Sequence, residues 1–359
     1  MKHLFLILPL VLSSLFLLTC VDIIDLEPPS SLGEGVSIQG ELIKGTPSVV
    51  EVRVSRLFNF DLKTLTPLQV KQVQLINEQN QIVDLQLSGR SLYRYVFNQP
   101  TDFPVEFGLS YKVRVELRDG KVYESTYEQL QPKSAQKSEL SFEIGAQTIQ
   151  LEDGTLSEVP IINFLVNTSI ATDAKEAKQK LTWISERTYQ LTDGLELSNF
   201  DNQTCYISAG LDFDEIKLLN GEDLTTDEVN KLKLSTVRLN HEFAEGYYYT
   251  TYERSLTDSA FLYFDRIRQL QERTGGLLEP AVGLLPTNLS NINDSKDANI
   301  YGYFTAFAQD TLRLYVSPEE VGNPNKLCPP RGIFMCWMIC CDCTEEKEST
   351  VVKPDFWEE

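Results

Sequence analysis

The sequence predicts a mainly β protein, in which an immunoglobulin-like β-sandwich is followed by a β-rich second domain with one or two helices. Several short segments alternate apolar and polar residues with a period of two, which is typical of half-buried strands. An Asp-Gly dipeptide joins two of these segments, as in a tight β-hairpin. Hydrophobic residues make up 42% of the 359 residues, which is enough to form the cores of two domains.

We expect the sandwich to cover residues 33–130. Its alternating segments are residues 50–55, 83–87, 93–97 and 113–117. The last segment leads into Asp119-Gly120, a dipeptide that the type I′ turn favours because both of its central residues need positive φ. Pairing Leu117 with Val122 across this turn gives the hairpin one apolar and one polar face, as a two-sheet sandwich requires.

The second domain is predicted to span residues 137–359, after a polar linker at residues 131–136. Expected strands lie at residues 141–150, 161–166, 183–191, 246–254, 300–307 and 311–316. One helix is predicted to start at Thr257 or Asp258, because either residue can cap it and an i, i+3, i+4 apolar stripe follows. Gly275 supplies a residue that can adopt the left-handed conformation at its end. A Cys-rich tail completes this domain.

Residues 1–19 are predicted to be a lipoprotein signal peptide. Lys2 supplies the positive charge, and the apolar run from Leu4 to Leu18 covers about 22 Å as a helix, which is too short to cross a bilayer. Leu17, three residues before Cys20, resembles the lipobox that bacterial signal peptidase cuts before the Cys thiol is acylated. The alternative is an ordinary secretory signal that contains a Cys. We expect a mature chain that is lipidated on Cys20 and continues as an acidic, Pro-bearing tether over residues 20–32.

The formal net charge of −20 argues against two classes of partner. Such a field repels phosphate backbones and anionic lipid headgroups. We therefore expect no nucleic-acid partner, and membrane contact through the acyl chains of the lipid anchor.

Six cysteines remain once Cys20 is lipidated, and outside the cytosol an even number predicts disulfides. Five of them cluster near the C-terminus: Cys328, Cys336, Cys340, Cys341 and Cys343. Because five cysteines cannot all pair among themselves, Cys205 must reach into the cluster if every cysteine is oxidised. The alternative is a thiolate metal site around Cys336, Cys340 and Cys343, although zinc sites usually need ligand pairs at two separate places.

The sequence offers little support for catalysis. His241 is the only histidine of the mature chain, no G-x-S-x-G or nucleotide-binding motif is present, and we predict no cofactor and no metal. Acidic clusters at residues 212–215 and 222–228 are interpreted as solvated surface, with a glycosidase-type carboxylate pair as the alternative. Oxygen-bearing side chains alternate over residues 291–299, which favours a loop with Asx turns over a calcium site.

Aromatic residues concentrate at residues 247–252. Tyr247 and Tyr249 are candidates for contact with a partner or ligand, whereas packing in the core is the alternative interpretation. Asp258-Ser259-Ala260 resembles a short bacterial O-glycosylation motif, although a Ser at a helix start also has a capping explanation.

Several of these segments together resemble a known family. They are Thr274-Gly275-Gly276-Leu277-Leu278-Glu279-Pro280, Tyr301-Gly302-Tyr303-Phe304 and the terminal Lys353-Pro354-Asp355-Phe356-Trp357. With the lipobox and the sandwich, they are similar to the Bacteroidota outer-membrane lipoproteins known as domain of unknown function 4249. The extra Cys336 and Cys340 depart from the pattern of that family.

The resemblance implies an outer-membrane lipoprotein that faces the cell surface or the periplasm and is often encoded beside a TonB-dependent receptor, and it implies no established activity. We therefore expect a cell-surface, non-catalytic accessory or ligand-capture subunit of such a β-barrel receptor. The alternatives are a structural subunit of another envelope complex and a carboxylate-dependent hydrolase.

Overall fold

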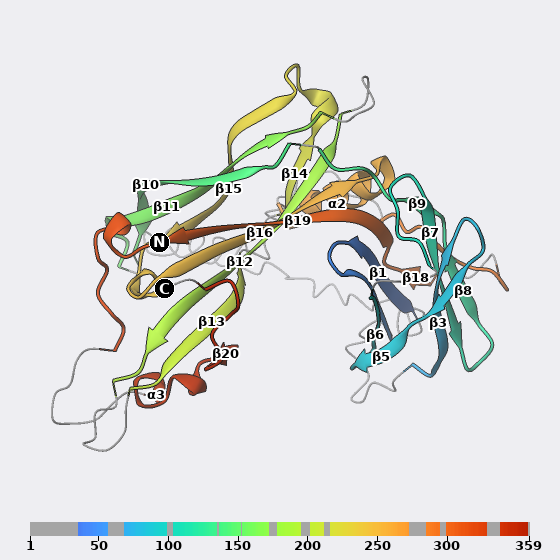
Figure 1. Ribbon diagram of the computed structural model, residues 1–359, viewed down its shortest axis with the longest axis horizontal. Helices are drawn as coiled ribbons and strands as arrows, with labels where there is room; N and C mark the ends of the chain where they lie inside the picture. Colours follow the sequence, from blue (N-terminus) through green and yellow to red (C-terminus); the bar gives the residue numbers. More distant parts are fainter. Residues whose placement is uncertain are drawn as a thin grey trace, which may run out of the picture.

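The computed structural model is mainly β, and its strands form one large sheet and two smaller ones (Figure 1). The structure describes residues 35–56, 68–98, 103–134, 136–151, 153–171, 178–194, 202–211, 216–272, 285–294, 299–328 and 338–357. The predicted fold class is confirmed.

The large sheet runs through both halves of the molecule in the order β20-β13-β12-β16-β19-β1-β2-β6-β5, with β14 beside β12 and β18 beside β1. Its strands are β1 (Val36–Lys44), β2 (Ser48–Arg56), β5 (Gln86–Gly89), β6 (Leu92–Phe97), β12 (Lys180–Thr192), β13 (Thr204–Leu211), β14 (Lys217–Asn220), β16 (Tyr247–Leu256), β18 (Ile300–Tyr301), β19 (Phe304–Val316) and β20 (Ser349–Thr350). In this sheet β1 pairs with β18 and β19 in parallel, and the other pairs are antiparallel.

Two smaller sheets pack against the same face of this large sheet. One has the order β17-β8-β7-β3-β4 with β9 beside β7, and the other has the order β10-β11-β15. Their strands are β3 (Val70–Asn77), β4 (Ile82–Asp84), β7 (Ser110–Leu117), β8 (Val122–Ser125), β9 (Glu128–Gln129), β10 (Glu139–Gln150), β11 (Leu156–Ser169), β15 (Glu228–Arg238) and β17 (Leu289–Asn291). On β19, Phe304 packs in the core that includes β3 and β7, and Leu312 packs in the core that includes β11. Because these two residues are an even number of positions apart on one strand, their side chains lie on the same face.

The N-terminal sandwich takes strands from two distant parts of the sequence. Its core contains Val52, Leu75 and Val113 from the predicted region, and also Leu289 and Phe304 from much later in the chain. The close parallel approach of β19 to β1 depends on Gly302, whose φ is +100°. A Cβ at this position would lie 2.0 Å from the backbone oxygen of Ile38. Strand β19 therefore joins the two halves covalently and through its pairing.

A stack of aromatic rings forms the centre of the second core. The ring of Phe164 on β11 lies 4.0 Å from that of Tyr249 on β16, and Tyr247 lies 4.0 Å from Phe243. Trp183 on β12 is buried in the same cluster. The β10-β11-β15 sheet and the large sheet therefore make a second sandwich beside the first.

The opposite face of the large sheet is covered by α2 (Asp258–Gln271) and, near the C-terminus, by Phe356 and Trp357. Helix α2 buries Ala260 and Tyr263 against Leu256 and Phe307. Thr257 is the N-cap, because its hydroxyl accepts the Ala260 N–H. The predicted stop at Gly275 lies outside the described residues.

At the other end of that face the indole of Trp357 lies 5.0 Å from the rings of both Tyr206 and Tyr248. A second helix, α3 (Met338–Cys341), lies on the side of the second core, where Cys340 is buried. Short 3-10 turns are η2 (Gly221–Asp223), η3 (His241–Phe243), η4 (Glu319–Val321) and η5 (Cys343–Glu345). Within the described residues, no helix has the length and apolar character needed to cross a membrane.

Candidate functional site

A cavity of about 580 Å³ lies where the two halves of the chain meet. Its walls come from β9, the linker that follows it, the start of β12, the end of β16 and the first turn of α2. We call it the junction pocket. Because its walls come from segments far apart in the sequence, only the folded chain assembles it.

Glu128 is the buried carboxylate of the junction pocket, with 3% of its surface exposed. Three neutral groups donate hydrogen bonds to it: the Thr257 hydroxyl at 2.7 Å, the Tyr303 hydroxyl at 2.8 Å and the Asn288 amide at 3.3 Å. Thr257 also caps α2, so the carboxylate lies at the positive end of that helix. Glu128 thereby connects the first sandwich to α2 and to the segment that enters β19.

Burial, followed by the negative charge of Glu128, raises the pKa of the Tyr303 hydroxyl above its ordinary value of 10.0. The phenol therefore stays protonated and donates at any physiological pH. Since donors surround Glu128, its primary role is structural.

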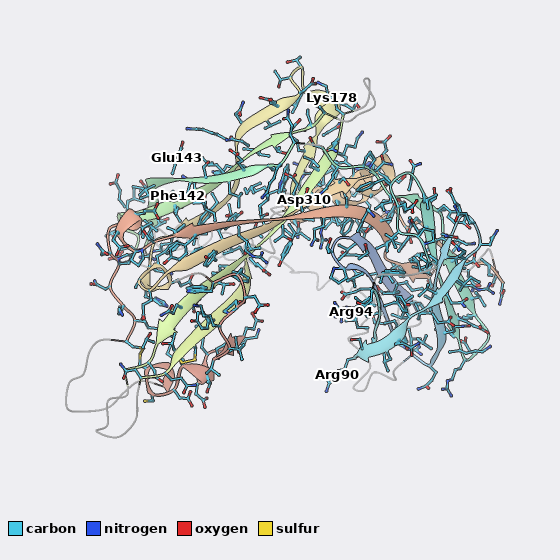
Figure 2. The ribbon with its side chains drawn as sticks, viewed as in Figure 1. Arg90, Arg94, Phe142, Glu143, Lys178 and Asp310 are labelled. Carbon is cyan, nitrogen blue, oxygen red and sulfur yellow. A yellow bond between two sulfur atoms is a disulfide. The ribbon has the colours of Figure 1, made fainter. Side chains whose placement is uncertain are left out.

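The linker between the halves is fixed to the second half at several points. The side-chain amide of Gln179 donates to the Pro132 carbonyl at 3.0 Å, and the Ser255 hydroxyl donates to the Gln131 carbonyl at 3.3 Å. Lys133 forms an ion pair with Asp310, which Figure 2 labels on β19. Ordering of the linker on both sides of the pocket holds the pocket walls in one geometry.

Just beyond the linker, the half-buried carboxylate of Glu253 accepts from the Ser138 hydroxyl at 2.8 Å and from the Trp183 indole N–H at 2.9 Å. Burial raises the pKa of Glu253 above its ordinary range despite these hydrogen bonds. This carboxylate also fixes the end of the linker to the second core.

The rim of the junction pocket carries charges of both signs. The Lys180 ammonium lies 2.7 Å from the Asp258 carboxylate, and the Glu222 carboxylate accepts the Lys178 N–H at 3.0 Å. The Lys178 ammonium donates to the carbonyls of residues 224 and 226 (Figure 2 labels Lys178). Such a site suits a polar ligand that exchanges hydrogen bonds with these groups, and it is poorly suited to an apolar one.

Those residues offered for catalysis that the structure describes belong to different elements. His241 opens η3, and burial lowers the pKa of its imidazole. Beside it, Glu242 pairs with Arg187 at 3.2 Å. Of the two acidic clusters, the first lies outside the described residues, and Glu222 of the second lines the junction pocket. Within the described part of the chain, no group of three or more His, Cys, Asp or Glu side chains is placed to hold a metal ion.

The oxygen-rich loop that begins at Asn291 adopts the predicted Asx turn. The Asn291 side-chain oxygen accepts the N–H groups of Asn293 at 3.0 Å and Asp294 at 3.3 Å. It therefore serves the backbone of its own loop, and residues 295–298 lie outside the described residues.

The prediction that Tyr247 and Tyr249 contact a partner or ligand is wrong. Both side chains are fully buried, with 0% exposure, because they point into the second core and stack with Phe164 and Phe243. The alternative interpretation, core packing, is confirmed. Even Tyr248, which points to the opposite face, is buried beneath Trp357.

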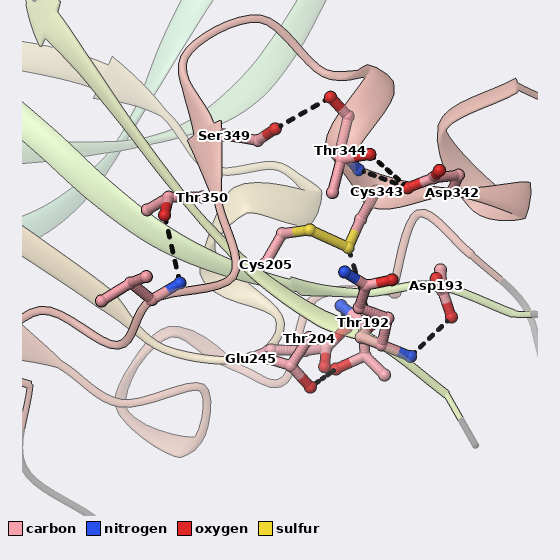
Figure 3. Close-up of a disulfide and its surroundings, with 12 residues drawn as sticks. Thr192, Asp193, Thr204, Cys205, Glu245, Asp342, Cys343, Thr344, Ser349 and Thr350 are labelled. Carbon is pink, nitrogen blue, oxygen red and sulfur yellow. Dashed lines mark hydrogen bonds between the residues drawn. A yellow bond between two sulfur atoms is a disulfide. The ribbon is translucent and has the colours of Figure 1, made fainter.

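Disulfides hold the C-terminal tail in place. Cys205 on β13 bonds to Cys343, so the isolated cysteine does reach into the cluster (Figure 3). Cys328 bonds to Cys340, and Cys341 is also disulfide-bonded. The described cysteines thus form disulfides, and the alternative of a thiolate site around Cys340 and Cys343 is wrong for these two sulfurs.

Cys336 and Cys20 lie outside the described residues, as do the signal peptide and the tether. No pattern in the sequence indicated the junction pocket. Its polar residues show no periodicity or motif, and only the linker prediction indicated where the two halves meet.

The family model described as Domain of unknown function (DUF4249) matches residues 21–313, which is more than half of the chain. The chain therefore belongs to this family. Neither a curated protein nor a solved structure matches the chain.

Proposed function

We propose that this member of the DUF4249 family is a lipid-anchored protein of the outer-membrane surface that captures a polar ligand as a non-catalytic accessory of a TonB-dependent receptor. The lipid anchor is supported by the motif Leu17-Leu18-Thr19-Cys20 at the end of a short apolar run. The acidic tether over residues 20–32 then gives the folded part reach above the membrane.

The junction pocket supports ligand capture. Its volume of about 580 Å³ falls in the range of small-molecule sites, and its linker wall is held by hydrogen bonds rather than left free. Lys180 and Asp258 at the rim form a partly exposed ion pair whose members can exchange partners with a polar ligand. Preformed walls reduce the entropy lost on binding.

Tethering to one membrane supports the role of an accessory. Two proteins held on the same surface meet at a raised effective concentration, so a modest direct affinity suffices for a stable complex. The ligand would then be passed to the receptor without a chemical step.

The anchor is tested by fractionation of a Cys20→Ser variant. We expect it to lose its acyl chains and to appear in soluble fractions at its unprocessed size. Thr19→Ala is the matched control, because it keeps the thiol, and it should remain with the membranes. Membrane partition of Cys20→Ser equal to that of the wild type would show that the lipoprotein proposal is wrong.

The accessory role is tested by affinity purification of the tagged protein from mildly solubilised outer membrane, together with protease shaving of whole cells. We expect a β-barrel protein to co-purify and external protease to remove the lipoprotein. Recovery of no β-barrel protein, with the lipoprotein protected from protease, would reject the role. Turnover of glycans, peptides or esters that a single carboxylate substitution abolishes would instead support the hydrolase alternative.

A further inference from the structure

Strand β10 forms an open edge of the three-stranded sheet, at the outside of the molecule (Figure 1). It pairs with β11 over all twelve of its residues without a register shift. Residues 143–148 are exposed one after another, and none of the described strands pairs with the outer side of β10. The strand is therefore a long, regular edge.

The register shows which backbone groups of β10 point outward. The Pro160 carbonyl on β11 accepts the Leu239 N–H at 3.0 Å, so it points away from β10. In an antiparallel pair the N–H and C=O of one residue point the same way, so Ala146, which lies opposite Pro160, directs both groups to the open side. The same holds for every second residue, so Ile144, Ala146, Thr148 and Gln150 offer eight backbone hydrogen-bonding groups in a row.

The other edge of the same sheet carries the usual protection against strand pairing, and β10 lacks it. Strand β15 has Lys231 at positive φ and register shifts against β11, and Lys233 adds a second positive charge. Bulges and lysines of this kind prevent edge-to-edge association. Residues 144–150 contain neither a charge nor a proline. An edge left open beside a protected one is suited to pairing.

The charges around the open edge define its partner. Glu139 precedes the uncharged segment, and Asp153 and Glu158 lie in the turn and on the strand beyond it. Glu143 also precedes the segment, and its carboxylate forms an ion pair with Lys231 on β15 at 2.7 Å. A second copy would bring the same carboxylates together in a protein of net charge −20, and like charges oppose that contact. We propose that residues 144–150 bind an extended segment of another protein as an added β-strand, and that this segment has an uncharged, alternating centre and basic flanks.

The proposal goes beyond the accessory role, since it holds whichever protein supplies the strand. The test uses the full mature protein in detergent micelles and a synthetic peptide with a Val-Thr-Val-Thr-Val-Thr centre and two lysines at each end. We expect hydrogen exchange at the amides of Ile144, Ala146 and Thr148 to slow at least tenfold on binding. The same centre flanked by glutamates should bind at least tenfold more weakly.

Two variants localise the binding. Ala146→Pro removes an outward N–H without touching the β10–β11 pairing, and Ala146→Lys with Thr148→Lys reproduces the protection seen on β15. Both should weaken peptide binding at least tenfold. The control, Gln79→Lys with Gln86→Lys, adds the same charge at exposed positions of the first sandwich and should leave peptide binding unchanged.

Equal binding by both peptides, protection elsewhere in the chain, or full binding by both β10 variants would overturn the proposal. Concentration-dependent protection of the same amides without peptide would show that a second copy occupies the edge instead.

Discussion

Replacing Glu128 with alanine is expected to destabilise the protein by about 3–4 kcal/mol. Three hydrogen bonds reach this buried carboxylate, at 2.7, 2.8 and 3.3 Å. A hydrogen bond to a charged group contributes about 1.5 kcal/mol at the low end of the measured range, so three contribute about 4–5 kcal/mol. Alanine also removes the cost of burying the charge, which offsets part of this loss.

Glutamine at the same position separates the hydrogen bonds from the packing. Its amide oxygen can still accept from Tyr303 and Asn288, whereas its amide nitrogen replaces the oxygen that accepts from Thr257. Glu128→Gln should therefore cost about 1–2 kcal/mol, clearly less than the alanine substitution.

The assay is urea unfolding of the non-reduced mature protein, followed by tryptophan fluorescence and by circular dichroism. Glu158→Ala is the matched control, because Glu158 is an exposed strand glutamate, and it should change stability by no more than about 0.5 kcal/mol. Since β19 belongs to both halves, we expect one transition with both probes. A loss below about 1 kcal/mol for Glu128→Ala, or one equal to that of the control, would refute this account of Glu128.

Two further predictions concern pH and the disulfides. Because burial raises the pKa of the Glu253 carboxyl, its contribution to stability is fully present below the unfolded pKa of about 4.3 and is lost as pH rises through the higher folded pKa. Urea midpoints measured from pH 4 to 8 should fall less steeply for Glu253→Gln than for the wild type, and parallel slopes would contradict this. Bonds Cys205–Cys343 and Cys328–Cys340 join residues 138 and 12 apart, so replacing the first pair by alanine should cost about 2 kcal/mol more than replacing the second. Equal losses in unfolding experiments would show that loop closure does not decide the difference.

Local patterns in the sequence predicted part of the secondary structure, but no pattern predicted β1, β3, β13 or β15. The predicted pairing of Leu117 with Val122 is wrong, because Glu116 pairs with Val122. Alternation predicted the strands around Val52 and Val113, and the cap at Thr257 with its apolar stripe predicted α2, because these signals depend on near neighbours in the chain. The odd number of clustered cysteines predicted that Cys205 joins the cluster if every cysteine is oxidised, and Cys205 does bond to Cys343.

Pairings between distant segments left no such signal. Nothing near Phe304 indicates that its strand lies parallel to β1, more than 250 residues earlier, or that it completes the first sandwich. Tyr247 and Tyr249 failed as contact residues for a related reason. Alternation shows that they share a face, but it does not show that β11 covers that face with Phe164.

The sequence by itself determined the mainly β class and the capped helix, since each follows from composition or from residues close together in the chain. The tertiary structure alone decided that one sheet runs through both halves, that Glu128 connects them beside a polar pocket, and that β10 stays open while β15 is protected. Burial, pocket walls and free sheet edges depend on which distant segments meet, and that is settled only when the whole chain packs together.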